Sequence, residues 1–211
     1  MRITCLTLLL TVFCLQISRA QSGGLLIRLR SMQPASDIFN KSVSNGSFGL
    51  NLGYSKTLKG GHWGGDITGF FDAMDYNFYI PYNMRFTGYT NYTGVAVGPK
   101  YCFNPKSDVQ FSLALYLKGG YNWGDGFVYK GPNEDEERQI ENKSVSAGTT
   151  TAFSPVASLT FPVDFGNIGI ELGYDSSDYG RGIRKLRSNY YQPINYHSGY
   201  LFAGVFFRLG D

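Results

Sequence analysis

The residues best suited to nucleophilic chemistry are two histidines, His62 and His197, and the serine that follows the second one. His197 and Ser198 could act as base and nucleophile, because an imidazole within hydrogen-bonding reach activates a hydroxyl. They lie at the start of an alternating segment, however, and adjacent residues of a strand point to opposite faces. His62 stands beside Trp63 at a short turn, a place typical of an interfacial residue. We therefore expect no catalytic residues and no enzyme activity.

Two charged clusters could bind ions. Residues 134–137 are four consecutive acids, whose oxygens suit calcium, but the run lacks the spacing of a calcium loop and favours a solvated loop. Four basic residues of a later link could contact phosphate groups of a surface or pair with the acidic run, with solvated charge as the alternative: Arg181, Arg184, Lys185 and Arg187. Glycine pairs such as Gly60-Gly61 precede no helix and predict no phosphate loop. We expect no metal and no cofactor.

The first 20 residues have the features of a secretory signal peptide. Arg2 supplies the positive charge, Leu6–Leu15 is an apolar core, and residues 18–20 (Ser-Arg-Ala) place small residues at the two positions that a signal peptidase reads. Acylation of Cys14 is the alternative, which the bulky Phe13 before it disfavours. We expect cleavage after position 20.

The remaining domain, residues 21–211, carries a net charge of +1, against +3 for the whole chain, and a single cysteine, Cys102. So small a charge gives no reason to expect nucleic acid as a partner. One cysteine cannot form an internal disulfide, so Cys102 is expected to pack as a small apolar residue. No stretch of this domain approaches the roughly 20 apolar residues of a membrane helix.

The dominant pattern of the domain is alternation of apolar and other residues with period 2, in segments of about ten residues, the length that a tilted strand needs to cross a bilayer. The alternation is clearest in 109–118, 168–175 and 200–209, where one face is uniformly apolar. The other face mixes polar, small and aromatic residues. Five weaker segments complete the count: Leu25–Met32, Ser47–Lys56, His62–Asp75, Gly88–Phe103 and Thr149–Val163.

The connections alternate in length. Short turns rich in Gly, Pro, Asn and Asp lie at 58–61, 104–107 and 164–167. Longer polar links lie near 33–46, 76–87, 124–147 and 176–196. This order predicts an all-β fold, a transmembrane antiparallel up-and-down β-barrel of about eight strands. Its short turns and both termini would face the periplasm and its long loops the outside.

Closure would turn the apolar face to lipid and the mixed face to a narrow lumen that side chains fill, without an open pore. The charged residues expected inside are Asp66, Lys100, Lys118, Glu171 and Arg208. Because an unpaired buried charge is costly, we expect an ion-pair network, with Glu171 and Arg208 as its leading pair. Aromatic residues near the strand ends are expected at the membrane interfaces, Tyr101, Phe103, Phe161 and Phe207 on the inner side and Tyr121, Trp123 and Tyr174 on the outer side.

In pattern and topology, residues 25–211 resemble the small outer-membrane β-barrel proteins of the OmpA/OmpX type. The most specific local feature lies in the last strand, where Gly204, Phe207 and Leu209 resemble the terminal signal that the barrel-assembly machinery recognises. The sequence departs from that signal at Phe202, where a polar residue is usual, and it ends in Gly-Asp without a terminal aromatic residue.

The resemblance implies a location in the bacterial outer membrane, with outer-membrane lipid and lipopolysaccharide as contacts and a surface or membrane protein as a partner. It also implies a non-enzymatic role in membrane structure, surface adhesion or partner docking. Two alternatives stay open. One is a lipid A-modifying enzyme with an outward-facing site near His197, and the other is a membrane subunit of a secretion or uptake complex.

Overall fold

The computed structural model describes residues 20–35, 44–131, 136–185, 189–190 and 199–210. The expected signal peptide lies outside these residues, except that the first strand begins at Ala20. The elements in chain order are β1 (Ala20–Pro34), β2 (Ser44–Leu58), β3 (Trp63–Ile80), β4 (Met84–Cys102), β5 (Gln110–Lys130), β6 (Arg138–Val163), β7 (Gly166–Asp175), the helix α2 (Gly180–Lys185) and β8 (Tyr200–Leu209). No helix of the described residues is long and apolar enough to cross a membrane.

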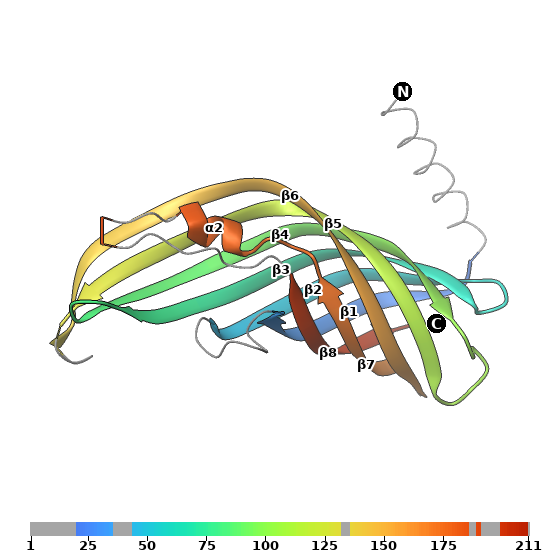
Figure 1. The fold of residues 1–211 in the computed structure, drawn as a ribbon. Helices are drawn as coiled ribbons and strands as arrows, with labels where there is room; N and C mark the ends of the chain where they lie inside the picture. The colour runs from blue at the N-terminus through green and yellow to red at the C-terminus, as the bar shows by residue number, and fades with distance from the viewer. Residues whose placement is uncertain (1–19, 36–43, 132–135, 186–188, 191–198, 211) are drawn as a thin grey trace, which may run out of the picture.

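The strands form one closed barrel, which confirms the predicted fold (Figure 1). Each strand pairs antiparallel with the next, and β1 pairs with β8 from Leu25↔Leu209 to Pro34↔Tyr200. The start of β1, the end of β8 and the turns β2–β3, β4–β5 and β6–β7 all lie at one end, which we call the short-turn end. At the β2–β3 turn Gly61 has φ of +79°, and a Cβ there would lie 2.8 Å from the Pro105 ring, so the two neighbouring turns can pack only around a glycine.

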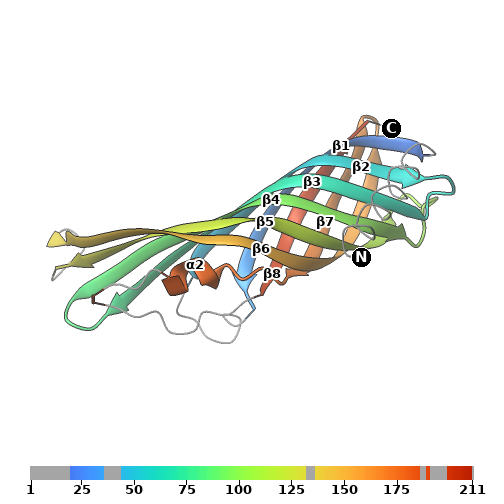
Figure 2. The same cartoon turned by 90° about the horizontal axis from the view of Figure 1, so that it is seen from above.

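The strands β3 to β6 are much longer than the ten residues expected from sequence. Two of the predicted loops, 76–87 and 124–147, are largely strand: β3 and β4 stay paired to Ile80↔Met84, and β5 and β6 to Lys130↔Arg138. Their outer parts form a four-stranded sheet that projects far beyond the barrel and that we call the protruding sheet (Figures 1 and 2). Alternation did not reveal it, because many residues of both its faces are at least partly exposed and neither face is uniformly apolar.

The outer wall of the barrel is apolar all the way round. Each of the eight strands contributes a large apolar side chain that is 39–52% exposed: Leu29, Leu52, Ile67, Val95, Leu115, Phe153, Ile170 and Val205. So continuous an exposed apolar surface is unfavourable in water and suits hydrocarbon, where the closed ladder also satisfies every backbone group.

Two groups of aromatic side chains border this apolar wall. At the short-turn end, Trp63 packs edge-on against Tyr101 at 4.8 Å between ring centroids, and Tyr101 against Phe103 at 5.0 Å. At the other border Trp123 lies 6.4 Å from Phe71 and 6.1 Å from Tyr121. Trp63 and Phe71 are eight residues apart on β3, about 27 Å along a strand. A tilt of about 40° reduces that to roughly 21 Å, close to the height of the apolar band of membrane barrels, about 25 Å.

A charge placed on this wall should therefore destabilise the barrel in a membrane. Ile170→Arg, in the middle of β7, is expected to destabilise the barrel in lipid vesicles by about 2–4 kcal/mol. Tyr79→Arg, on the protruding sheet and 73% exposed in the native chain, is the matched control and should change stability little. Urea unfolding followed by tryptophan fluorescence measures both. Equal losses for the two variants would contradict a lipid-facing wall.

Candidate functional site

The lumen is filled by two layers of charged side chains. In the first layer Arg28 of β1 donates to Asp66 of β3 at 2.5 Å, and its Nε lies 3.2 Å from Glu171 of β7. Tyr116 of β5 completes this layer, because its hydroxyl donates to Asp66 at 2.5 Å and its ring lies under the Arg28 guanidinium at 4.7 Å. Lys100 of β4 stands beside the layer, 3.8 Å from Asp66.

The second layer lies toward the protruding sheet and repeats this arrangement. Arg30 of β1 donates to Asp72 of β3 at 2.9 Å. Lys118 of β5 contacts both Asp72 at 2.6 Å and Asp175 of β7 at 2.5 Å. These four side chains are at most 5% exposed. They form a closed set of charge-assisted hydrogen bonds in a region where unpaired charges would be very costly.

Both layers draw on the same four strands, β1, β3, β5 and β7, which are not neighbours in the barrel. An inward side chain therefore meets partners two strands away, across the lumen. The two layers and Lys100 together contain four cations and four carboxylates, so the network has no net charge. The cations are Arg28, Arg30, Lys100 and Lys118, and the carboxylates are Asp66, Asp72, Glu171 and Asp175. The network braces opposite walls of the barrel.

One expected ion pair, between Glu171 and Arg208, is not found in the structure. Glu171 pairs with Arg28 and not with Arg208, since Glu171 stands opposite Gly204 in the β7–β8 register while Arg208 stands opposite Asn167. Arg208 lies nearer the short-turn end and donates to Thr57 at 3.3 Å. Asp66, Lys100, Lys118 and Glu171 all lie in the network. Sequence reasoning left out Arg28 and Arg30, although their alternation with Leu25, Ile27 and Leu29 was a usable signal.

A tyrosine closes the end of the lumen opposite the short turns. After β7 the chain enters the barrel at Tyr179, which is fully buried and whose hydroxyl donates to Asp72 at 2.6 Å. Its ring packs edge-on against Tyr92 at 5.7 Å and Tyr200 at 4.8 Å. Met32, Phe70, Met74 and Phe202 belong to the same apolar cluster. This end of the lumen is therefore filled by side chains, as the sequence led us to expect.

The expected assembly signal lies in β8, where Gly204, Phe207 and Leu209 are paired with β1 and β7. Gly204 has a structural role in addition to any part in recognition. A Cβ at this position would lie 2.6 Å from the Leu29 carbonyl oxygen and 3.0 Å from the Arg30 side chain. The glycine thus leaves room for Arg30 to reach the lumen.

The expected basic surface cluster is described only in part. Arg181 and Lys185 lie on α2, and Lys185 donates to the Ser146 carbonyl oxygen at 3.2 Å. The Arg184 side chain and Arg187 lie outside the described residues, as do His197 and Ser198. His62 stands at the short-turn end, with Nδ1 2.9 Å from the Cys102 carbonyl oxygen and its ring stacked on Tyr101.

No protein-family model matches the chain, and no curated protein matches it. Among solved structures it is similar to Ail, the attachment invasion locus protein of Yersinia pestis, at 15% identity and a TM-score of 0.41 over 90% of this chain and 95% of that one. It is also similar to Neisserial surface protein A, at 13% identity and a TM-score of 0.40 over 88% and 94%. At these values the comparisons say nothing about a shared role.

The two-layer network predicts strong coupling between its members. Lys118→Met leaves Asp72 and Asp175 without their shared cation and should cost about 3–5 kcal/mol of unfolding free energy. Adding Asp175→Asn removes one of the two carboxylates and should recover part of that loss, so the double variant loses less than the sum of the single ones. Urea unfolding of the four proteins in one detergent measures the cycle. Strictly additive losses would show that the ion pairs are not coupled.

Proposed function

We propose that the chain is a non-enzymatic integral protein of the bacterial outer membrane that anchors a docking sheet at the cell surface. The observation that carries the proposal is the combination of a closed, apolar-walled barrel with a protruding sheet, one edge of which pairs with no other strand of the described residues. Export by the signal peptide 1–20 and insertion by the barrel-assembly machinery belong to the same proposal. The outer membrane is the membrane that holds barrels of this kind.

The unpaired edge belongs to β6. This strand pairs with β7 only from Val156 to Val163, and Ser176 adds one more backbone hydrogen bond, to Phe153. Among the described strands, none but β5 pairs with the eighteen residues from Arg138 to Pro155. Side chains bond the inner part of this stretch: Lys185 donates to the Ser146 carbonyl oxygen, Tyr92 to that of Thr150, and the Phe153 N–H donates to Ser176. The outer part, 138–145, is the open edge of the described sheet. An exposed strand edge presents unpaired N–H and C=O groups and accepts an extended segment of another protein as an additional strand.

An ion pair between its two hairpins fixes the shape of the protruding sheet. Arg85, near the tip of the β3–β4 hairpin, forms a two-pronged ion pair with Glu137 beside the start of β6, at 2.5 Å for its shortest contact. The Arg85 guanidinium also lies over the Tyr129 ring at 5.2 Å. This link ties the two hairpins together, and a rigid surface loses less conformational entropy when it binds. Tyr79 and Tyr82 stand exposed near the tip, where aromatic side chains favour contact with proteins.

The placement of Glu171 supports a non-enzymatic role. A lipid A-modifying site near His197 would need an acid that orients the histidine, and Glu171 stands on β7, the strand next to β8. This carboxylate is buried in the lumen, where it pairs with Arg28. It is therefore not available to a site on the outer face of the barrel.

The docking role is tested by shortening the β5–β6 hairpin. Gly124 and Val145 are directly paired, so deletion of 124–145 and closure with an Asn-Gly turn should keep the register of the remaining ladder and remove the outer part of the β6 edge, 138–145. Cells that make the intact chain are expected to attach to surfaces coated with extracellular-matrix proteins. Cells that make the shortened chain should attach no better than cells without it.

Lys59→Ser is the control, since it alters an exposed turn at the opposite end of the barrel and leaves the whole protruding sheet intact. Surface amounts of all variants are equalised by labelling of intact cells. Attachment that survives the deletion would exclude the outer part of the β6 edge as the docking site.

A further inference from the structure

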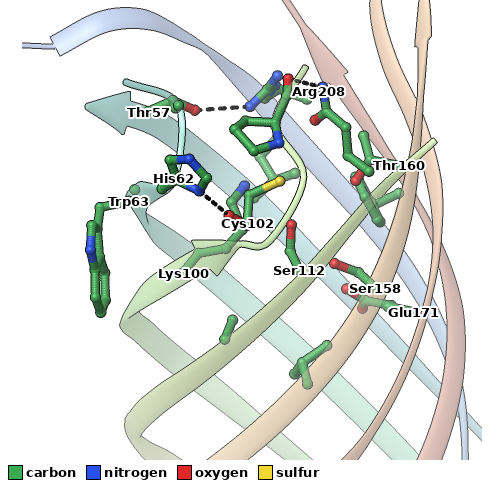
Figure 3. Close-up of a pocket in the computed structure, with 18 of the residues that line it drawn as sticks. Thr57, His62, Trp63, Lys100, Cys102, Ser112, Ser158, Thr160, Glu171 and Arg208 are labelled. Atoms are coloured by element: carbon green, nitrogen blue, oxygen red, sulfur yellow. Dashed lines mark hydrogen bonds between the residues drawn. The ribbon is translucent and has the colours of Figure 1, made fainter. Parts of the chain in front are cut away.

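A cavity of about 190 Å³ opens at the short-turn end of the lumen (Figure 3). Gly61, His62 and Pro105 of the two turns β2–β3 and β4–β5 line its mouth. Its floor is the first charged layer, where Arg28, Tyr116 and Glu171 close the passage to the rest of the lumen. A single water needs only about 15 Å³, so this blind cavity has room for a small solute with some of its hydration.

One wall of the cavity is lined with hydroxyl groups. Ser112 stands directly opposite Ser158 in the β5–β6 register, and Gln110 directly opposite Thr160. Figure 3 shows the hydroxyls of Ser112 and Ser158 on the cavity side. Within the described part of the chain these two hydroxyls and that of Thr160 bond to no other side chain. Each is able to donate to an oxygen of a bound molecule.

Positive charge lies on strands to either side of this wall. Lys100 of β4 and Arg208 of β8 both line the cavity, and the Lys100 side chain is 20% exposed. The floor contributes Arg28 but also its two carboxylate partners, Asp66 and Glu171. Among the described residues that line the cavity, Arg28, Lys100 and Arg208 are basic and Glu171 alone is acidic. A cation is therefore disfavoured here, and an anion is attracted.

We propose that this cavity binds a small anion of the phosphate class, held by Lys100, Arg208 and the hydroxyls of Ser112, Ser158 and Thr160, which all line it. Cationic and hydroxyl donors that converge on one enclosed space are what a tetrahedral oxyanion requires. The network behind the cavity blocks onward passage, so the anion binds and is not conducted. The same chemistry is offered by a soluble phosphate monoester and by a phospholipid headgroup at the membrane border.

The test uses the chain purified from membranes in a non-ionic, phosphate-free detergent, at constant ionic strength set with chloride. Inorganic phosphate and glycerol 3-phosphate are titrated and followed by ³¹P NMR. Saturable binding is expected, and Lys100→Met and Arg208→Gln should each weaken it about tenfold or more, the loss expected for a hydrogen bond to a charged group. Lys100→Arg should restore most of it. Lys59→Met removes the same charge from an exposed turn at the same end and should have no effect.

Cys102 reports the position of the anion, because it lines the same cavity and is the single cysteine of residues 21–211. Bound phosphate should slow alkylation of Cys102 by the neutral reagent N-ethylmaleimide, as counted by mass spectrometry, and Lys100→Met should abolish this protection. A folded barrel migrates differently in an SDS gel before and after boiling, so a variant without this difference has a folding defect. If Lys100→Met has such a defect, the comparison of Lys100→Arg with the native chain decides whether the charge at this position binds the anion.

Binding of both soluble probes assigns the site to a free phosphate monoester. Protection of Cys102 only in phosphatidylglycerol nanodiscs, with no binding of the soluble probes, assigns it to a headgroup. Absence of saturable binding in detergent together with unchanged alkylation in nanodiscs would overturn the proposal. Binding that Lys59→Met weakens as much as Lys100→Met does would also overturn it.

Discussion

Two layers of ion pairs across the lumen hold together four strands that are not neighbours in the ladder. The cations of these layers come from β1 and β5 and the carboxylates from β3 and β7, so each ion pair joins two strands that have another strand between them. The outer wall can contribute little to this bracing, because its apolar side chains contact lipid whichever way the barrel flexes. The cross-section of the barrel thus depends on its charged interior.

The charged interior also separates the two ends of the molecule. On one side Tyr179 and the apolar cluster fill the lumen beneath the protruding sheet. On the other side the Arg28 layer forms the floor of the cavity at the short turns. A surface for docking and a cavity for a small anion can therefore exist in one barrel without a path between them. The charged side chains that separate the two ends are buried, and their mutual ion pairs offset the cost of removing them from water.

The barrel could be predicted from the sequence because alternation and connection length are local properties of the chain. The sequence also placed Asp66, Lys118 and Glu171 on the inner face for the same reason. The predicted ion pair of Glu171 with Arg208 was wrong, because reasoning from neighbouring strands cannot find a partner two strands away. The inner position of Arg28 follows from its alternation with Ile27 and Leu29, yet its partners depend on the register of three strands.

Sequence also missed the protruding sheet and the cavity. In β6, residues such as Lys143, Ser144 and Thr149 show no apolar alternation, since the outer part of this strand has no uniformly apolar face. Only the backbone pairing with β5 reveals the strand. The cavity arises where inward residues of β5 and β6 are small, and the space left by Ser112 and Ser158 is visible only once the closed barrel places Lys100 and Arg208 around it.

The central claim is that the chain is a closed barrel in a membrane, and heat-modifiable gel mobility tests it most directly. A closed strand ladder resists SDS until it is boiled, because opening one strand pair breaks a cooperative ring. The account predicts recovery in the outer-membrane fraction and a change in electrophoretic mobility between unheated and boiled samples. Recovery as a soluble periplasmic protein with identical mobility before and after boiling would contradict it, and the apolar wall would then have to be buried by another part of the chain or by a partner.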